Sequence, residues 1–137
     1  MIGLIRWLPA LLWMAVIYYF SSKTGDDLDG WLAVLHRWFP ALQSFDFGHF
    51  FSYLVLGWTF VWAFRPKRLT AAVMAGIVLL CFLYGITDEY HQSFVPRRSV
   101  SLTDLRNDGI GAAIGMALLH IPPLRRLYAK AVDAKYY

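Results

Sequence analysis

A polar stretch in the second half of this chain carries the side chains best suited to chemistry. Residues 84–115 read YGITDEYHQSFVPRRSVSLTDLRNDGIGAAIG, with carboxylates, arginines, a histidine and amides between apolar ends. Carboxylates and imidazoles act as general acids and bases, and they also bind hard or borderline cations. Arginine pairs with phosphate or carboxylate through a planar fork of donors. The stretch is therefore suited to binding or transforming an anionic or hydroxylated molecule.

The rest of the chain is strongly apolar. Of its 137 residues, 58% are hydrophobic and only 16% are charged, with a mean hydropathy of +0.46. This balance is typical of a membrane protein, in which polar groups are costly unless they face protein or water. The formal charge of +4 does not indicate a nucleic-acid partner, because the basic residues lie mostly beside the apolar segments. We expect membrane lipids as partners.

Four segments approach the roughly 20 apolar residues that a membrane-spanning helix needs. They are Ile2–Phe20, Phe47–Phe64, Leu69–Thr87 and Leu102–Pro122. We predict an all-α membrane protein that forms one domain over residues 1–137, a compact bundle of four transmembrane helices. The single cysteine, Cys81, lies in an apolar run, so it cannot form an internal disulfide and is expected to pack in the core.

A short amphipathic helix is predicted between the first and second spans. Its apolar residues recur at helical spacing: Leu28, Trp31, Leu32, Leu35, Trp38 and Phe39. Thr24 and Asp27 are placed to cap its start, and Pro40 is expected to end it. The segment is too short to span a bilayer, so it lies in the interface or folds over the mouth of the bundle as a lid.

Three of the predicted helices each carry a polar or small-residue stripe along one face. The stripes are His49, Tyr53 and Gly57; Gly85, Glu89 and Gln92; and Asp104, Asp108, Gly111 and Gly115. Such stripes are best satisfied by facing one another, and paired glycines let helices approach closely. Asp88 and His91 fall on an adjacent face, where we expect them to contact water.

The distribution of basic residues predicts the orientation. On one side of the membrane, the ends of the predicted helices and the segments beside them carry Arg6, Arg65, Lys67, Arg68, Arg125, Arg126, Lys130 and Lys135. The acids from Asp26 to Asp108 gather on the other side. Basic residues near helix ends favour the cytoplasmic side. We therefore predict a multi-pass protein of the cytoplasmic membrane with both termini inside and the polar stretch outside.

The segments FDFGHFFSYLVLG and YGITDEYHQSFVPRRSVSLTDLRNDGIGAAIG resemble the VanZ-like family of small bacterial membrane proteins. The family pattern has a His with Tyr four residues on, a Glu with Gln three on, a Pro followed by an Arg, an Asp with a polar residue four on, and two glycines. The resemblance implies site residues His49, Tyr53, Glu89, Gln92, Arg98, Asp104 and Asp108. It also implies a role at the outer face of the cytoplasmic membrane and a link to glycopeptide-antibiotic resistance.

This chain departs from the family pattern at three positions. Gly48 stands where a basic residue is common, Arg97 where Gly is usual, and Asp108 where Asn is common. The last departure suggests that position 108 is valued for hydrogen bonding more than for charge. Asp104, by contrast, is expected to pair with Arg98 or an equivalent cation.

Three functional interpretations fit these residues. In the first, the pocket binds an anionic or glycan-bearing cell-envelope molecule, such as an envelope precursor or a glycopeptide, with Arg98 on its phosphate or carboxylate. In the second, Glu89 or His49 is a general base in a hydrolase or transferase acting on an envelope phosphate or glycan linkage. In the third, Glu89, Arg98 and the two aspartates only form ion pairs that hold the helices. No spacing specific to a metal is present, so we predict neither metal nor cofactor.

Overall fold

The computed structural model describes residues 2–38 and 46–131, and every regular element in that part of the chain is an α-helix. The helices are α1 (Ile2–Ile5), α2 (Leu8–Ser21), α3 (Gly25–Trp38), α4 (Asp46–Phe64), α5 (Ala71–Gln92), α6 (Leu102–Leu118) and α7 (Pro122–Ala131). The all-α class expected from the sequence is thus confirmed for the described residues.

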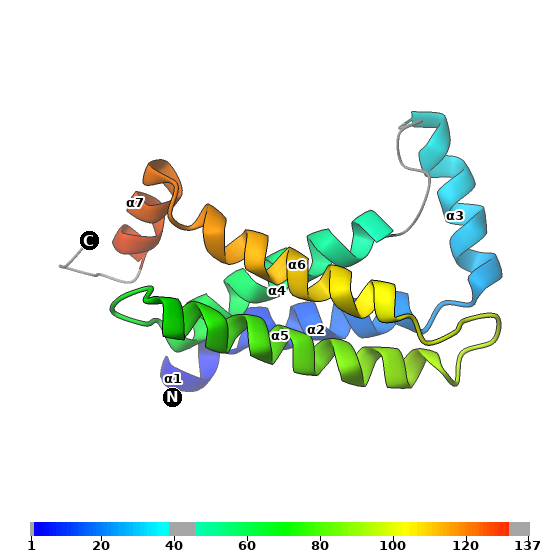
Figure 1. The fold of residues 1–137 in the computed structure, drawn as a ribbon, viewed down its shortest axis with the longest axis horizontal. Coiled ribbons are helices and arrows are strands. Elements are labelled where there is room, and N and C mark those ends of the chain that lie inside the picture. The colour runs from blue at the N-terminus through cyan, green and yellow to red at the C-terminus, as the bar shows by residue number, and fades with distance from the viewer. Residues whose placement is uncertain (1, 39–45, 132–137) are drawn as a thin grey trace.

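Helices α2, α4, α5 and α6 lie side by side, and α3 stands away from them at one end (Figure 1). The loop between α5 and α6 lies at this same end. The short helices α1 and α7 lie at the opposite end, together with the loop between α4 and α5 (Figure 1). The closest packing is between α4 and α6, and the core includes Leu56, Ile77 and Cys81. Cys81 is fully buried, as expected.

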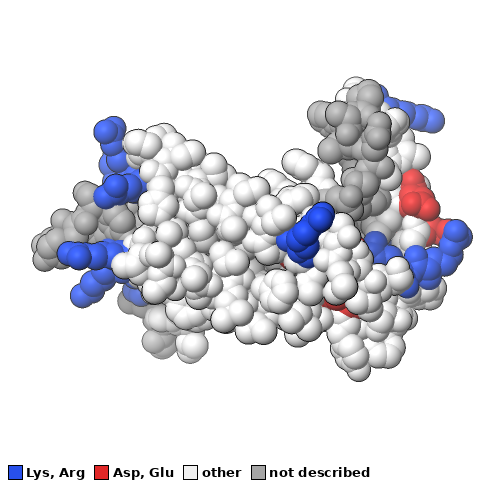
Figure 2. Space-filling model, viewed as in Figure 1, with Lys and Arg blue, Asp and Glu red and all other residues white. Residues whose placement is uncertain are grey.

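The surface composition fits a membrane protein. Three stretches are long and apolar enough to cross a bilayer: Gly3–Ser21, Phe47–Phe64 and Ala71–Gln92. The fourth bundle helix, α6, has 17 residues and carries ionisable side chains in its first turns. Figure 2 shows charged side chains gathered at the two ends of the helices, with a mostly uncharged band between them. Three of the four predicted spans are therefore supported by length and composition.

The first predicted span is interrupted near its start. Helix α1 ends at Ile5, and α2 begins at Leu8. Pro9 explains the break, because proline has no N–H to donate and its ring clashes with the carbonyl of residue 5. The prediction of one unbroken helix from Ile2 to Phe20 was wrong in this detail.

The last predicted helix also ends earlier than expected. Helix α6 stops at Leu118, and the prolines at 122 and 123 begin the separate helix α7, whose first turn tolerates their missing N–H groups. Tyr128 of α7 is buried and donates its hydroxyl hydrogen to the carbonyl of Pro66 at 2.9 Å. This bond fastens α7 to the loop between α4 and α5.

Helix α3 begins as its sequence predicts. The Asp27 N–H donates to the Thr24 hydroxyl at 3.3 Å and the Thr24 N–H donates to the Asp27 carboxylate at 3.2 Å, which forms a capping box. Of its apolar face, Leu28 is buried but Trp38 is 78% exposed. The bundle covers Leu28 but leaves Trp31 and Trp38 exposed, as expected for a helix at a membrane interface. The predicted end at Pro40 lies outside the described residues.

The close approach of α4 and α6 depends on two glycines of α6. A Cβ atom placed on Gly111 would lie 2.3 Å from the carbonyl oxygen of Phe50, and one on Gly115 would lie 2.9 Å from that of Leu54. Both distances are too short for any side chain, and the obstructing atoms belong to backbone that cannot move aside. The sequence prediction that this pair permits helix contact is consistent with this geometry.

We therefore predict that Gly111→Ala destabilises the protein by about 1–3 kcal/mol, the usual cost of overpacking a tight interface. The matched control is Gly76→Ala on α5, where an added Cβ has no neighbour within 4 Å. That change should be neutral or slightly stabilising, because alanine favours helix more than glycine does. Thermal unfolding of the two variants in detergent tests this, and equal melting temperatures would contradict it.

Candidate functional site

The polar stripes of α4 and α6 meet at His49. Its Nδ1 atom lies 2.9 Å from Asp108 Oδ1, and its Nε2 atom lies 3.8 Å from Asp104 Oδ2. A carboxylate oxygen accepts, so Nδ1 carries the hydrogen of this bond. The Asp108 side chain has no exposed surface, and the His49 side chain is 14% exposed. Asp108 therefore fixes the orientation of the imidazole ring from behind.

Glu89 connects α5 to the start of α6. Its Oε2 atom accepts a hydrogen bond from the backbone N–H of Ser101 at 2.6 Å. Ser101 is the N-cap of α6, and its hydroxyl accepts from the N–H of Asp104 at 3.1 Å. Glu89 thus holds the first turn of α6, and with it Asp104, in place.

A chain of hydrogen bonds joins Asp88, Gln92 and Arg98. The Gln92 amide nitrogen donates to Asp88 Oδ2 at 2.9 Å. The Gln92 amide oxygen accepts from Arg98 Nε at 3.2 Å and from Arg98 Nη2. Both the nitrogen and the oxygen of the Gln92 amide are therefore hydrogen-bonded, which fixes the orientation of the amide. Gln92 thus bridges Arg98 and the Asp88 carboxylate.

This arrangement corrects two expectations. Arg98 does not pair with Asp104; among the described side chains it is His49 that lies beside the Asp104 carboxylate. Within the described part of the chain, no ion pair joins Arg98 to a carboxylate, so the proposed network of ion pairs through Arg98 does not form there. Asp88 does not face water either, because it is only 4% exposed.

The turn before Arg98 explains one departure from the family pattern. The N–H of Arg98 donates to the carbonyl of Val95 at 3.1 Å, and Arg97 has a φ of 59°. Proline followed by a residue of positive φ is typical of a type II turn, in which the second position favours glycine. The backbone here thus suits the glycine usual in the family. Arg97 occupies the position at a cost in strain and pairs with Asp26 on the surface.

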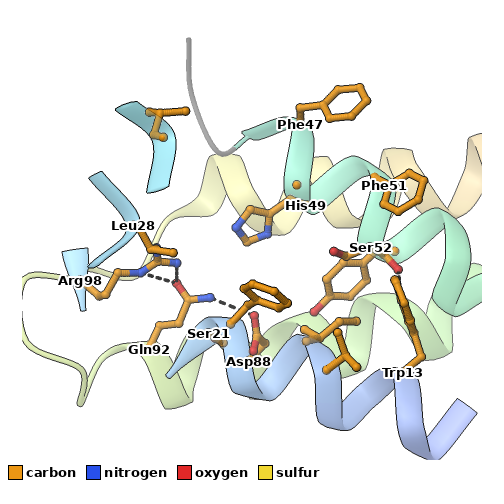
Figure 3. A pocket seen from close by; sticks show the side chains of 16 residues that line it. Trp13, Ser21, Leu28, Phe47, His49, Phe51, Ser52, Asp88, Gln92 and Arg98 are labelled. Carbon is orange, nitrogen blue, oxygen red and sulfur yellow. Dashed lines mark hydrogen bonds between the residues drawn. The ribbon is translucent and has the colours of Figure 1, made fainter. Parts of the chain in front are cut away.

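A cavity of about 350 Å³ lies between α2, α3, α4 and α5. Figure 3 shows Arg98, Gln92 and Asp88 on one side of it, with Trp13 and Phe51 on the other and His49 between them. Its lining is Trp13, Val16, Ile17, Phe20, Ser21, Leu28, Leu32, Phe47, Gly48, His49, Phe51, Ser52, Tyr53, Asp88, Gln92 and Arg98. The size is within the range of small-molecule sites.

Several polar atoms at this site are buried without a hydrogen-bond partner in the described structure. Three of them belong to residues that line the cavity: Tyr53 Oη, and Ser21 Oγ and Asp88 Oδ1, whose two side chains interact with each other without good hydrogen-bond geometry. Glu89 Oε1 and Asp108 Oδ2 lie behind them. A buried polar group without a partner costs about 1–3 kcal/mol, so these atoms call for bound water or a ligand.

The predicted site residues separate into two layers. His49, Tyr53, Gln92 and Arg98 line the cavity, whereas Glu89, Asp104 and Asp108 lie behind it and hold the helices or the imidazole. Ser21 and Asp88 were missed as lining residues. The spacing of Asp88 and Gln92, four residues apart on α5, could have indicated that Asp88 lines the cavity. Among the described residues, no group of three His, Cys, Asp or Glu side chains is arranged to hold a metal ion.

We predict that Asp108→Asn leaves stability within about 1 kcal/mol of the parent, because an amide oxygen still accepts from His49 Nδ1. Asp108→Leu, of similar size, should cost about 1–3 kcal/mol because it leaves a buried N–H without an acceptor. Thermal unfolding of the purified variants measures both effects. Equal losses in the two would show that charge, and not the hydrogen bond, is what position 108 provides.

One comparison with known proteins identifies a family. The family described as VanZ/LLP1 matches residues 6–122, a range that includes α2 to α6 and all the candidate site residues. No curated protein and no solved structure matches the chain. A match over most of the chain shows the family, and the chain belongs to the VanZ/LLP1 family.

Proposed function

We propose that this protein binds an anionic or glycan-bearing molecule of the bacterial cell envelope in the polar part of the cavity. Arg98 offers the remaining N–H groups of its guanidinium to a phosphate, carboxylate or sugar oxygen. Tyr53 and Ser21 have hydroxyls that can donate or accept, and Asp88 can accept. Together these groups can bind a polar group of the ligand that both accepts and donates hydrogen bonds.

The unpartnered polar atoms on the cavity wall carry this proposal. Tyr53 is 1% exposed and Asp88 is 4% exposed, yet each has a polar atom without a partner in the described structure. A protein that only needed a stable bundle would gain by replacing such groups with apolar side chains of the same shape. Their position on one cavity, beside Arg98, supports a role in binding.

We further propose that α6 crosses the membrane as a fourth span, with both termini in the cytoplasm and the cavity toward the outside. The basic residues Arg65, Arg68 and Arg125 lie in the elements at the α7 end, and the acidic first turn of α3 lies at the cavity end. This asymmetry supports the orientation. In this proposed orientation the cavity would be accessible to envelope molecules, which fits a link to glycopeptide resistance.

A second candidate function is hydrolysis or group transfer at an envelope phosphate or glycan linkage. The His49–Asp108 pair favours it, since a carboxylate that holds Nδ1–H leaves Nε2 as a general base. His49, and not Glu89, is then the base, because His49 lines the cavity and Glu89 lies behind it. A cleaved or shortened ligand in mass spectra of the purified protein would identify this activity.

The topology predicts opposite accessibility for two engineered cysteines. Cys81 is first replaced by alanine, and Ser99→Cys or Lys67→Cys is then introduced at exposed loop positions at opposite ends of the bundle. In intact cells, a membrane-impermeant maleimide should label position 99, and it should label position 67 only after permeabilisation. The reverse pattern would invert the proposed orientation.

Arg98→Lys should reduce retention of envelope phosphates or glycans by about tenfold or more, nearly as much as Arg98→Ala. A lysine ammonium cannot place two N–H groups on Gln92 and still present a planar fork to the cavity. Native mass spectrometry of gently purified protein measures the retained molecules. Full retention in Arg98→Lys would show that a positive charge at position 98 is sufficient and that the planar guanidinium is not needed.

The neighbouring Arg97 provides the matched control. Its ion pair with Asp26 is exposed, with 69% of the Arg97 side chain accessible, so it contributes little to stability. Arg97→Gly removes the same charge one residue away and suits the positive φ at that position. Retention should remain at the parental level, and a loss equal to that of Arg98→Lys would contradict a specific role for Arg98.

A further inference from the structure

The cavity extends well beyond its polar groups. Half of its lining is apolar, contributed by α2, α3 and α4: Trp13, Val16, Ile17, Phe20, Leu28, Leu32, Phe47 and Phe51. The polar side chains gather on one side, where Asp88, Gln92 and Arg98 meet (Figure 3). A sugar or phosphate that occupied only this side would leave the apolar part unfilled. The shape and chemistry of the cavity indicate a ligand with an apolar part as well.

The apolar part of the cavity reaches the flank of the bundle. Phe20, Phe51 and Val16 all line the cavity, yet they are 48%, 51% and 38% exposed. These residues belong to α2 and α4, two helices whose length and composition suit a bilayer. In the proposed orientation this flank faces hydrocarbon, so an aliphatic chain can reach the cavity sideways without crossing water.

The polar side of the cavity can accept a hydrogen bond from the ligand. Asp88 Oδ2 accepts from Gln92 and the Ser21 hydroxyl also interacts with the Asp88 carboxylate, while Asp88 Oδ1 has no hydrogen bond of good geometry in the described structure. A carboxylate oxygen needs an N–H or O–H to satisfy it, which a phosphodiester does not supply. A hydroxyl of a sugar or polyol does, and its oxygen can in turn accept from Arg98 or Tyr53.

We propose that the ligand is a lipid with one aliphatic chain in the cavity and a hydroxylated head. The chain lies between α2 and α4, against Val16 and Phe51, and a head hydroxyl donates to Asp88 Oδ1. The volume of about 350 Å³ is near the lower limit for ligand sites, which suits part of a single chain better than the two chains of a phospholipid. This inference rests on the proposed function for the head and adds the chain and the hydroxyl donor.

The test uses the full-length protein in phosphatidylcholine nanodiscs and three probes. Dodecyl maltoside has a chain and a hydroxylated head, maltose has the head alone, and dodecylphosphocholine has a chain and a head without hydroxyls. Native mass spectrometry measures their binding. Dodecyl maltoside should bind at least about tenfold more tightly than either of the others. Equal binding of the two chain-bearing probes would overturn the inference, because the hydroxyls would not be recognised.

Two tryptophan substitutions on α2 separate the cavity from the surrounding bilayer. Val16→Trp fills the apolar part of the cavity, whereas Leu12→Trp adds the same side chain at a position that is 65% exposed and outside the cavity lining. Binding of dodecyl maltoside should fall about tenfold or more in Val16→Trp and remain unchanged in Leu12→Trp. Equal binding in both variants would show that the chain lies elsewhere, and would overturn the inference.

The same experiment distinguishes failure of the inference from failure of the proposed function. If maltose binds as tightly as dodecyl maltoside and its binding is lost in Arg98→Lys, the proposal that the cavity binds an aliphatic chain is wrong. The proposed recognition of the polar headgroup would still stand. Binding of neither maltose, dodecyl maltoside nor inorganic phosphate would overturn both. Because Leu12→Trp and Val16→Trp introduce the same side chain, a loss in the second alone cannot come from a general effect of tryptophan on folding.

Discussion

The contact of α4 with α6 is the constraint on which the rest of the structure depends. Gly111 and Gly115 bring the backbone of α6 against the carbonyls of Phe50 and Leu54. At that separation the side chains on either side of the contact must pair across it, and His49 meets Asp108. A wider spacing would take His49 and Asp108 beyond hydrogen-bond distance and leave a buried carboxylate without this partner. Close packing and polar pairing are therefore one feature of this interface.

Helix α5 shows how the bundle divides structural from binding groups. Its consecutive acids Asp88 and Glu89 point about 100° apart, as helix geometry requires. Glu89 turns toward the start of α6 and holds Ser101, whereas Asp88 turns toward α2 and the cavity. One carboxylate is thus used to join two helices, and its neighbour is available to a ligand. The division follows from α5 having α6 on one side and α2 on the other.

Much of the fold could be predicted from sequence because helical periodicity and capping are local. The stripe of His49 and Tyr53, the Thr24–Asp27 capping box and the glycine pair of α6 depend on residues only a few positions apart. Periodicity gives the face of a residue but not what covers that face, so Asp88 was misplaced toward water and Arg98 toward Asp104. Both errors concern contacts set by how α2 and the α5–α6 loop sit against the bundle.

The turn that precedes Arg98 also bears on the entropy of binding. Pro96 fixes one backbone angle of this turn, and Arg97 is held at a positive φ that few residues adopt. With Gln92 holding its guanidinium, Arg98 has little freedom left before any ligand arrives. A side chain already ordered loses less on association, and a long arginine otherwise loses about 0.5–1.5 kcal/mol. The turn and Gln92 thus move part of the entropy cost of recognition into folding, where it is met once, however many ligands bind.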